Sequence, residues 1–155
     1  METPLVGLKV PDFEAASTGN ATFKLSSALG RPLVLYFYPK DNTPGCTVEG
    51  QQFRDLHAEF ARAGCAVYGI SRDSVKSHEN FRSKMEFPFD LLSDPDEKLC
   101  SLFGVMKMKN MYGKQVRGIE RSTFVIGRDG VVRREWRGVR GPGHAREVLE
   151  FVRSL

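Results

Sequence analysis

Cys46 stands where an apolar segment gives way to a helical pattern, a position that suits nucleophilic sulfur chemistry. The unbroken apolar and aromatic run at 33–38 is typical of a strand buried on both faces. Pro44 and Gly45 predict a tight turn after it, and an amphipathic helical pattern begins at Cys46. Cys46 therefore falls in the first turn of a helix, where free backbone N–H groups and the positive end of the helix dipole favour a thiolate.

The residues around Cys46 suit the attack of a thiolate on a peroxide. The sulfur attacks one oxygen and expels the other, so the site must align the O–O bond and stabilise negative charge on the leaving oxygen. Thr43 can place its hydroxyl beside the sulfur or the peroxide, and Pro39 can shield the sulfur from water without adding an N–H donor. The remaining requirement is a fixed cation, which arginine meets because it stays protonated and offers several donors.

Strand and helix patterns alternate along the rest of the chain. The predicted extended segments are an N-terminal hairpin (12–16 and 21–25), two buried strands (33–38 and 65–70), a short stretch (88–92) and a late hairpin (122–126 and 131–136). The predicted helices run from about Thr43 to Ala63, from Ser74 to about Met85, around Leu99, and along the last residues. The polar segment 107–118 is predicted to be irregular.

This order predicts an α/β fold in which a central mixed β-sheet is flanked by helices and preceded by an N-terminal β-hairpin. A strand, a turn with a cysteine at the start of a helix, and a late hairpin together form the thioredoxin-like arrangement. No internal repeat or linker divides the sequence, so residues 1–155 are expected to form a single domain. The fold alone does not settle the chemistry.

Pro39, Thr43 and Cys46 also carry a family resemblance. Their spacing resembles the Pro-x-x-x-Thr-x-x-Cys signature of the peroxiredoxins, and residues 38–47 are most similar to the bacterioferritin-comigratory-protein (Q type) subfamily. The segments 94–105, 111–114 and 118–126 resemble the same family, in order, so that the similarity covers nearly the whole chain. The resemblance implies a thioredoxin-like fold and a cofactor-free, thiol-dependent peroxidase that reduces hydrogen peroxide and organic hydroperoxides in antioxidant defence and cell redox homeostasis.

Carried over position by position, the resemblance implies a role for five residues. Cys46 corresponds to the peroxidatic cysteine, Thr43 and Arg121 to the residues that activate it, and Pro39 to the residue that shields it. Glu49 resembles an acidic residue that can orient the arginine.

The sequence departs from the family where the oxidised sulfur must be regenerated. A sulfenic acid has to return to the thiol, and Q-type members often use a second cysteine five residues after the first or in the next helix. Gln51 occupies the first of these positions, and Phe81 and Arg82 occupy the second. The missing cysteines favour a single-cysteine cycle with no resolving cysteine, in which thioredoxin, or glutathione with glutaredoxin, reduces Cys46.

Two further cysteines leave an alternative open. Cys65 opens an apolar strand and is expected to pack in the core. Cys100 lies between Leu99 and Leu102 in a short helix, a position to which the family resemblance gives no catalytic part. An atypical internal disulfide between Cys46 and either of them is the alternative cycle.

Composition restricts the compartment and the partners. Three cysteines and the lack of a signal-peptide pattern favour a cytoplasmic location, and no apolar run approaches the roughly 18 residues of a membrane span. The net charge of +4 suggests nucleic-acid binding, but acidic residues separate the late arginines and no nucleic-acid motif is present. The histidines lack metal-ligand spacing, so no metal is expected. Because Q-type relatives are often monomers, a monomer is expected.

Two other functions fit part of the pattern. A thiol–disulfide oxidoreductase uses Cys-x-x-Cys, but Thr43 stands where the first sulfur would be. A redox sensor or a basic nucleic-acid-binding module would show salt-dependent DNA binding without peroxide turnover.

Overall fold

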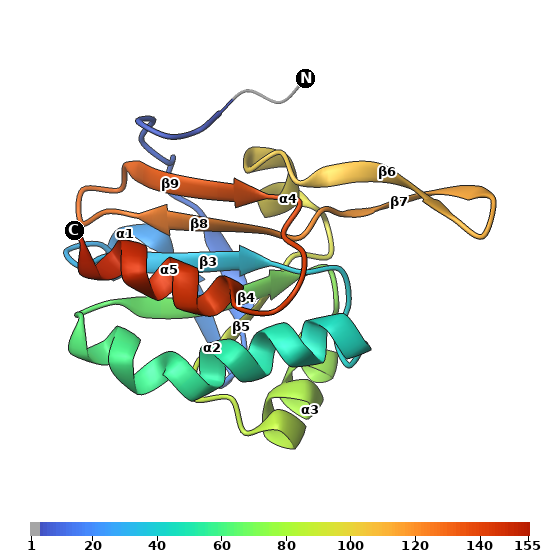
Figure 1. Ribbon diagram of the computed structural model, residues 1–155, viewed down its shortest axis with the longest axis horizontal. Helices are drawn as coiled ribbons and strands as arrows, with labels where there is room; N and C mark the ends of the chain where they lie inside the picture. The colour runs from blue at the N-terminus through green and yellow to red at the C-terminus, as the bar shows by residue number, and fades with distance from the viewer. Residues whose placement is uncertain (1–3) are drawn as a thin grey trace.

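The computed structural model describes residues 4–155 as a seven-stranded sheet with helices on both faces and a separate two-stranded hairpin (Figure 1). The sheet contains β1 (Glu14–Ser17), β2 (Ala21–Lys24), β3 (Leu33–Phe37), β4 (Ala66–Ser71), β5 (Leu91–Ser93), β8 (Ser122–Ile126) and β9 (Val132–Arg137). The hairpin contains β6 (Met106–Met111) and β7 (Lys114–Ile119). The helices are α1 (Leu25–Ala28), α2 (Pro44–Arg62), α3 (Val75–Met85), α4 (Lys98–Leu102) and α5 (His144–Arg153).

The sheet is mixed, as the sequence predicts. Its strand order is β2-β1-β5-β4-β3-β8-β9. β3, β4 and β5 run parallel, whereas the N-terminal hairpin and the pair β8–β9 join antiparallel at the two sides. The predicted α/β class, the mixed sheet and the N-terminal hairpin are therefore confirmed.

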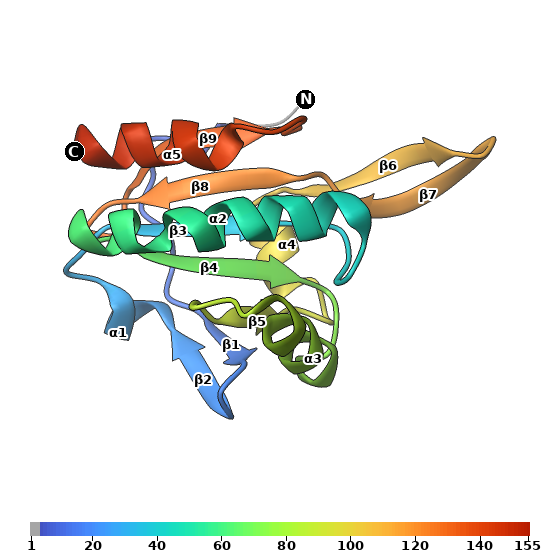
Figure 2. The same ribbon diagram turned by 60° about the horizontal axis from the view of Figure 1, so that its bottom comes forward.

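β3 forms the centre of the core because both of its faces are buried. Successive side chains of a strand point to opposite faces, and here they divide between two apolar clusters. The cluster under α2, α3 and α5 receives Val34, Tyr36 and Tyr38. The opposite cluster, which includes residues of α4 and of the N-terminal hairpin, receives Leu33, Leu35 and Phe37. Figure 2 shows α2 and α5 side by side over one face of the sheet.

The pairing of β3 with β8 determines where two of the predicted site residues meet. The two strands are antiparallel, with Phe37 opposite Ser122. The start of β8 consequently lies beside the end of β3, where the chain turns into α2. Arg121, one residue before β8, is thus brought to the turn that contains Cys46.

The prediction of an irregular segment at 107–118 is wrong. Residues 106–119 form the hairpin β6–β7, which projects from the body of the protein (Figures 1 and 2). Its turn residues Tyr112 and Gly113 both have positive φ, 53° and 78°, as a tight two-residue hairpin turn requires. The alternation of apolar and polar residues is weak here because most side chains of β7 are exposed, so the pattern on which strand prediction depends is missing.

The other elements agree with their predicted positions within a few residues. Ser74 caps α3 by accepting a hydrogen bond from the N–H of Ser77 at 3.1 Å. The carboxylate of Asp94 accepts hydrogen bonds from the N–H groups of Leu99 and Cys100 at the start of α4. The one-turn helix α1 was not predicted. Within residues 4–155, no helix has the length and apolar character needed to cross a membrane.

Candidate active site

Cys46 lies in the first turn of α2, as its sequence context predicts. Pro44 is the first helical residue, a place where its missing N–H costs no hydrogen bond. The N–H groups of Gly45 and Cys46 follow it, and the first turn of a helix provides no carbonyl acceptor for them. The Cys46 side chain is only 2% exposed. Its sulfur is therefore placed at the positive end of a 19-residue helix and screened from bulk water.

Thr43 occupies the cap position of α2 without capping it. Its backbone is extended, with φ −94° and ψ 155°, but its side chain makes no capping hydrogen bond. The hydroxyl instead donates to the carbonyl of Lys40 at 2.9 Å. Because that carbonyl holds the hydroxyl proton, the oxygen lone pairs remain available to accept a hydrogen bond from another molecule.

Arg121 bridges Cys46 and Glu49. Its Nη2 donates to the Cys46 Sγ at 3.3 Å, and its Nη1 donates to Glu49 Oε1 at 2.6 Å. Cys46 and Glu49 lie three residues apart in α2 and therefore on the same face of the helix. The planar guanidinium fits this pair because its donors have fixed directions.

The charges of Arg121 and Glu49 depend on their surroundings and on each other. Burial raises the pKa of Glu49 to about 7, although Arg121 beside it acts in the opposite direction. Burial lowers the pKa of Arg121, but Glu49 and Cys46 more than offset this effect and leave the pKa above its usual range. Glu49 Oε2 is buried and has no hydrogen-bond partner among the described residues. Arg121 is therefore a permanent cation, whereas Glu49 can change its charge near neutral pH.

Two hollows reach Arg121 from the surface. The first, of about 350 Å³, lies beside the start of α2 and has an apolar wall formed by Pro44, Val48, Val139 and Pro142. The second, of about 500 Å³, lies between the body and the β6–β7 hairpin and is lined in part by Pro39, Lys107 and Lys109. Pro39 is half-buried and forms part of this second wall.

Sequence reasoning missed two residues that contribute to the site. His144 begins α5 and lines the first hollow, and burial lowers its pKa to about 4, so that it is neutral at pH 7. Lys109, on the hairpin predicted to be irregular, lines the second hollow, and burial there lowers its pKa, with Arg121 adding to the effect. The only sequence signal for His144 was its place at the start of a helix.

Comparison with known proteins identifies the chain. The profile of the AhpC/TSA family matches residues 6–135. The chain belongs to the AhpC/TSA family. Within it, peroxiredoxin Bcp of Xanthomonas campestris pv. campestris is 52% identical over 92% of this chain and 89% of its own length. Peroxiredoxin Bcp of Bacillus subtilis is 44% identical over 97% of this chain and 96% of its own length.

Solved structures give the same identification. A crystal structure of a Xylella fastidiosa PrxQ mutant superimposes with a TM-score of 0.94 at 43% identity, covering 99% of this chain and 98% of that one. A structure of Xanthomonas campestris peroxiredoxin Q gives a TM-score of 0.90 at 49% identity, over 97% and 98% of the two chains. The present chain is thus a thioredoxin-fold peroxiredoxin, a thiol-dependent peroxidase that acts on peroxides with thiol reductants.

The other two cysteines of this peroxiredoxin lie away from Cys46. Cys65 precedes the amino end of β4, whereas Cys46 follows the carboxyl end of the adjacent parallel strand β3, so the length of the paired strands, about 13 Å, lies between them. Cys100 packs in the cluster on the other face of the sheet. Burial raises the pKa of Cys65 to about 12 and the pKa of Cys100 further above its ordinary value. Both are free, buried thiols.

Proposed function

We propose that Cys46 is the peroxidatic cysteine and that Thr43, Arg121, Pro39 and Glu49 assist it. The observation that carries the proposal is the 3.3 Å contact between the Arg121 guanidinium and the Cys46 sulfur at the start of α2. The guanidinium and the free N–H groups of the first turn stabilise negative charge on the sulfur. A nucleophilic thiolate results.

In the first step, the Cys46 thiolate attacks the terminal oxygen of the hydroperoxide. The S–O bond forms as the O–O bond breaks, and the other oxygen leaves as alkoxide or hydroxide, which takes a proton from water. Sulfur is oxidised to the sulfenic acid, and the peroxide is reduced to alcohol or water. Thr43 accepts a hydrogen bond from the peroxide O–H, since its own proton is held by Lys40. Arg121 stabilises the charge that develops on the leaving oxygen.

In the second step, an external thiol attacks the sulfenic sulfur, releases water and forms a mixed disulfide. A second thiol then releases the Cys46 thiolate. The positions of Cys65 and Cys100 support this single-cysteine cycle, because two α-carbons more than about 7 Å apart cannot be joined by a disulfide without backbone movement. Thioredoxin, or glutathione with glutaredoxin, is the proposed reductant, acting on a monomer in the cytoplasm.

The substrates of this cycle are hydrogen peroxide and organic hydroperoxides. The apolar wall of the hollow beside Arg121 and the start of α2 supports the second class, because it can receive an alkyl group. The Xanthomonas campestris bacterioferritin comigratory protein, 51% identical with a TM-score of 0.87 over 92% of this chain and 90% of that one, has been described for its alkyl peroxide reduction activity.

The test is peroxide consumption by the purified protein, supplied in parallel with the thioredoxin and the glutathione–glutaredoxin systems. Cys46→Ser is expected to abolish turnover, and Cys65→Ala and Cys100→Ala to retain most of it. Intact mass after one equivalent of peroxide separates the two cycles, since a sulfenic acid gains one oxygen and an internal disulfide loses two hydrogens. Turnover by Cys46→Ser, or a disulfide in the oxidised protein, contradicts the proposal.

A further inference from the structure

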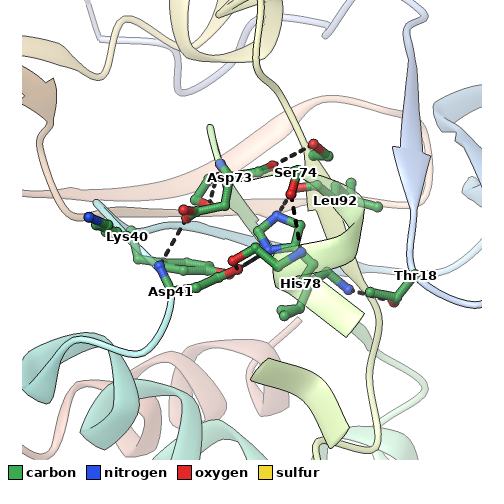
Figure 3. A network of polar contacts seen from close by, with 12 residues as sticks. Thr18, Lys40, Asp41, Asp73, Ser74, His78 and Leu92 are labelled. Carbon is green, nitrogen blue, oxygen red and sulfur yellow. Dashed lines mark hydrogen bonds and ion pairs between the residues drawn. The ribbon is translucent and has the colours of Figure 1, made fainter. Parts of the chain in front are cut away.

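A buried polar cluster lies behind the turn that carries the active-site residues. Tyr38 and Asp41 come from the segment between β3 and α2, His78 comes from α3, and the Leu92 carbonyl belongs to β5. Figure 3 shows Asp41, Asp73 and His78 directed toward one another. His78 is 0% exposed, and Asp41 is also buried. None of these side chains has a part in the peroxide chemistry described above.

The hydrogen bonds of His78 fix the orientation of its ring. Its Nε2 lies 2.9 Å from the Leu92 carbonyl oxygen, which can only accept, so Nε2 donates to it. Its Nδ1 lies 2.7 Å from Asp41 Oδ2. The Asp41 carboxylate also receives hydrogen bonds from the Tyr38 hydroxyl at 2.6 Å and the Ser77 hydroxyl at 2.8 Å. His78 is thus held at both ring nitrogens, and one of these contacts reaches the turn between β3 and α2.

A second acid holds the backbone of the same turn. Asp73 accepts hydrogen bonds from the Asp41 N–H at 2.9 Å and from the Ser71 hydroxyl, and its carboxylate lies within 4.8 Å of the polar atoms of Asp41 and His78. The same three side chains resemble a metal-ligand set, but both nitrogens of His78 are taken up by Asp41 and Leu92.

The cluster ties the turn to α3. Asp41 is two residues from Pro39 and two from Thr43, and its side chain and backbone N–H are both held by the cluster. The next residue, Asn42, has a left-handed backbone with φ 60°, which asparagine adopts readily, and its Oδ1 accepts a hydrogen bond from Lys84 of α3 at 3.0 Å. Contacts from α3 therefore hold two successive residues of the turn.

We propose that His78 is a positioning residue for the peroxide step: through its buried hydrogen bond to Asp41, it fixes the turn that carries Pro39 and Thr43 and leads into Cys46. This inference rests on the proposed role of Cys46. A displacement of about 1 Å in a reacting group can lower a rate by about 100-fold, so loss of the Asp41 contact acts on catalysis without touching the substrate.

Two variants separate positioning from a general loss of packing. In His78→Asn the amide nitrogen lies where Nδ1 lies, so the donor to Asp41 remains and the Leu92 carbonyl loses its donor. In His78→Gln the amide nitrogen reaches the place of Nε2, so the donor to Leu92 remains and Asp41 loses the donor from residue 78, keeping those from Tyr38 and Ser77. Each variant therefore removes one buried hydrogen bond of residue 78. If His78 only contributed to packing, the two variants would show a similar loss in the rate constant for Cys46 oxidation.

The measurement is the second-order rate constant for oxidation of Cys46 by peroxide, followed by stopped-flow fluorescence of Trp136. The rate constant for His78→Asn is expected to exceed that for His78→Gln by about tenfold or more. Equal rate constants, or a faster His78→Gln, overturn the proposal.

A measurement on the wild-type protein keeps the proposal falsifiable if either variant fails to fold. The ¹H–¹⁵N spectrum of His78 is expected to show an Nε2–H proton that exchanges slowly with water, as its buried hydrogen bond to the Leu92 carbonyl requires, and a rapidly exchanging ring proton overturns the inference. The role of Cys46 is tested separately by intact mass of the oxidised wild type. A failure of the proposed role of Cys46 can therefore be distinguished from a failure of the proposed role of His78.

Discussion

Arg121 donates to the sulfur of Cys46 across a sequence separation of 75 residues. Antiparallel pairing of β8 with β3 creates this contact, because it puts the residue before β8 beside the residues that follow β3. The same guanidinium holds Glu49, one turn further along α2. The Arg121 guanidinium thus connects the residue before β8 with the start of α2 and with the buried Glu49. Its orientation is fixed by the hydrogen bonds to Cys46 and Glu49.

Arg121→Lys is expected to lower the rate constant for oxidation of Cys46 by about 10- to 100-fold, since a charge-assisted hydrogen bond contributes about 1.5–3 kcal/mol. Lysine keeps the charge but cannot direct donors to the sulfur and to Glu49 together. Stopped-flow measurement with hydrogen peroxide checks this. Arg140→Lys, a change at an exposed arginine beside the same hollows, is the matched control. Equal losses of the oxidation rate constant in the two variants would mean that the fixed directions of the guanidinium donors of Arg121 are unimportant.

Glu49→Gln is expected to change how stability depends on pH. The pKa of Glu49 rises from 4.5 to about 7 on folding because the carboxyl is buried. The folded state therefore holds this proton more tightly, and the stabilisation is complete below pH 4.5 and lost as the pH rises through about 7. A rise from 4.5 to about 7 corresponds to about 3 kcal/mol.

Urea denaturation of both proteins at about pH 5 and about pH 8 tests this effect of Glu49. On passing from the lower to the higher pH, the free energy of unfolding of the wild type should fall relative to that of Glu49→Gln. Other titrating groups are shared and cancel in the difference. Parallel pH dependence of the two proteins would show that Glu49 keeps an ordinary pKa.

The sequence predicts the part of the proposed site that lies along one segment. Pro39, Thr43 and Cys46 follow a single strand-to-helix junction, so local pattern and motif suffice to propose them. Arg121 needed the family resemblance, because nothing local distinguishes it from other arginines that flank strands. The contact of His78 with Asp41 depends on how α3 packs against the end of β3, and no periodicity in the sequence reports that packing.

Gly45→Ala is expected to slow Cys46 oxidation while leaving stability nearly unchanged. A Cβ at this position would lie 3.2 Å from Nη2 of Arg121, so the guanidinium has to move by a few tenths of an ångström. Gly45 is exposed and its φ is not positive, so the backbone accepts alanine. Stopped-flow oxidation and thermal unfolding are measured together. A rate equal to that of the wild type would show that Arg121 adjusts without loss.

Gly50→Ala, in the interior of α2, is expected to destabilise the fold. In a helix interior this change normally stabilises by about 1 kcal/mol. Here the new Cβ would overlap Cζ of Phe87. That ring is stacked on Phe89 with centroids 5.0 Å apart and meets Phe81 edge-on at 5.1 Å, so it has little room to retreat.

Overpacking of this kind costs about 1–3 kcal/mol, and urea denaturation of Gly50→Ala should show a net loss. The double variant Gly50→Ala/Phe87→Leu is the control, because leucine removes the ring atoms that the new methyl group meets. It should be more stable than the sum of the two single changes predicts. If Gly50→Ala is as stable as the wild type, the aromatic cluster under α2 is looser than its ring contacts indicate.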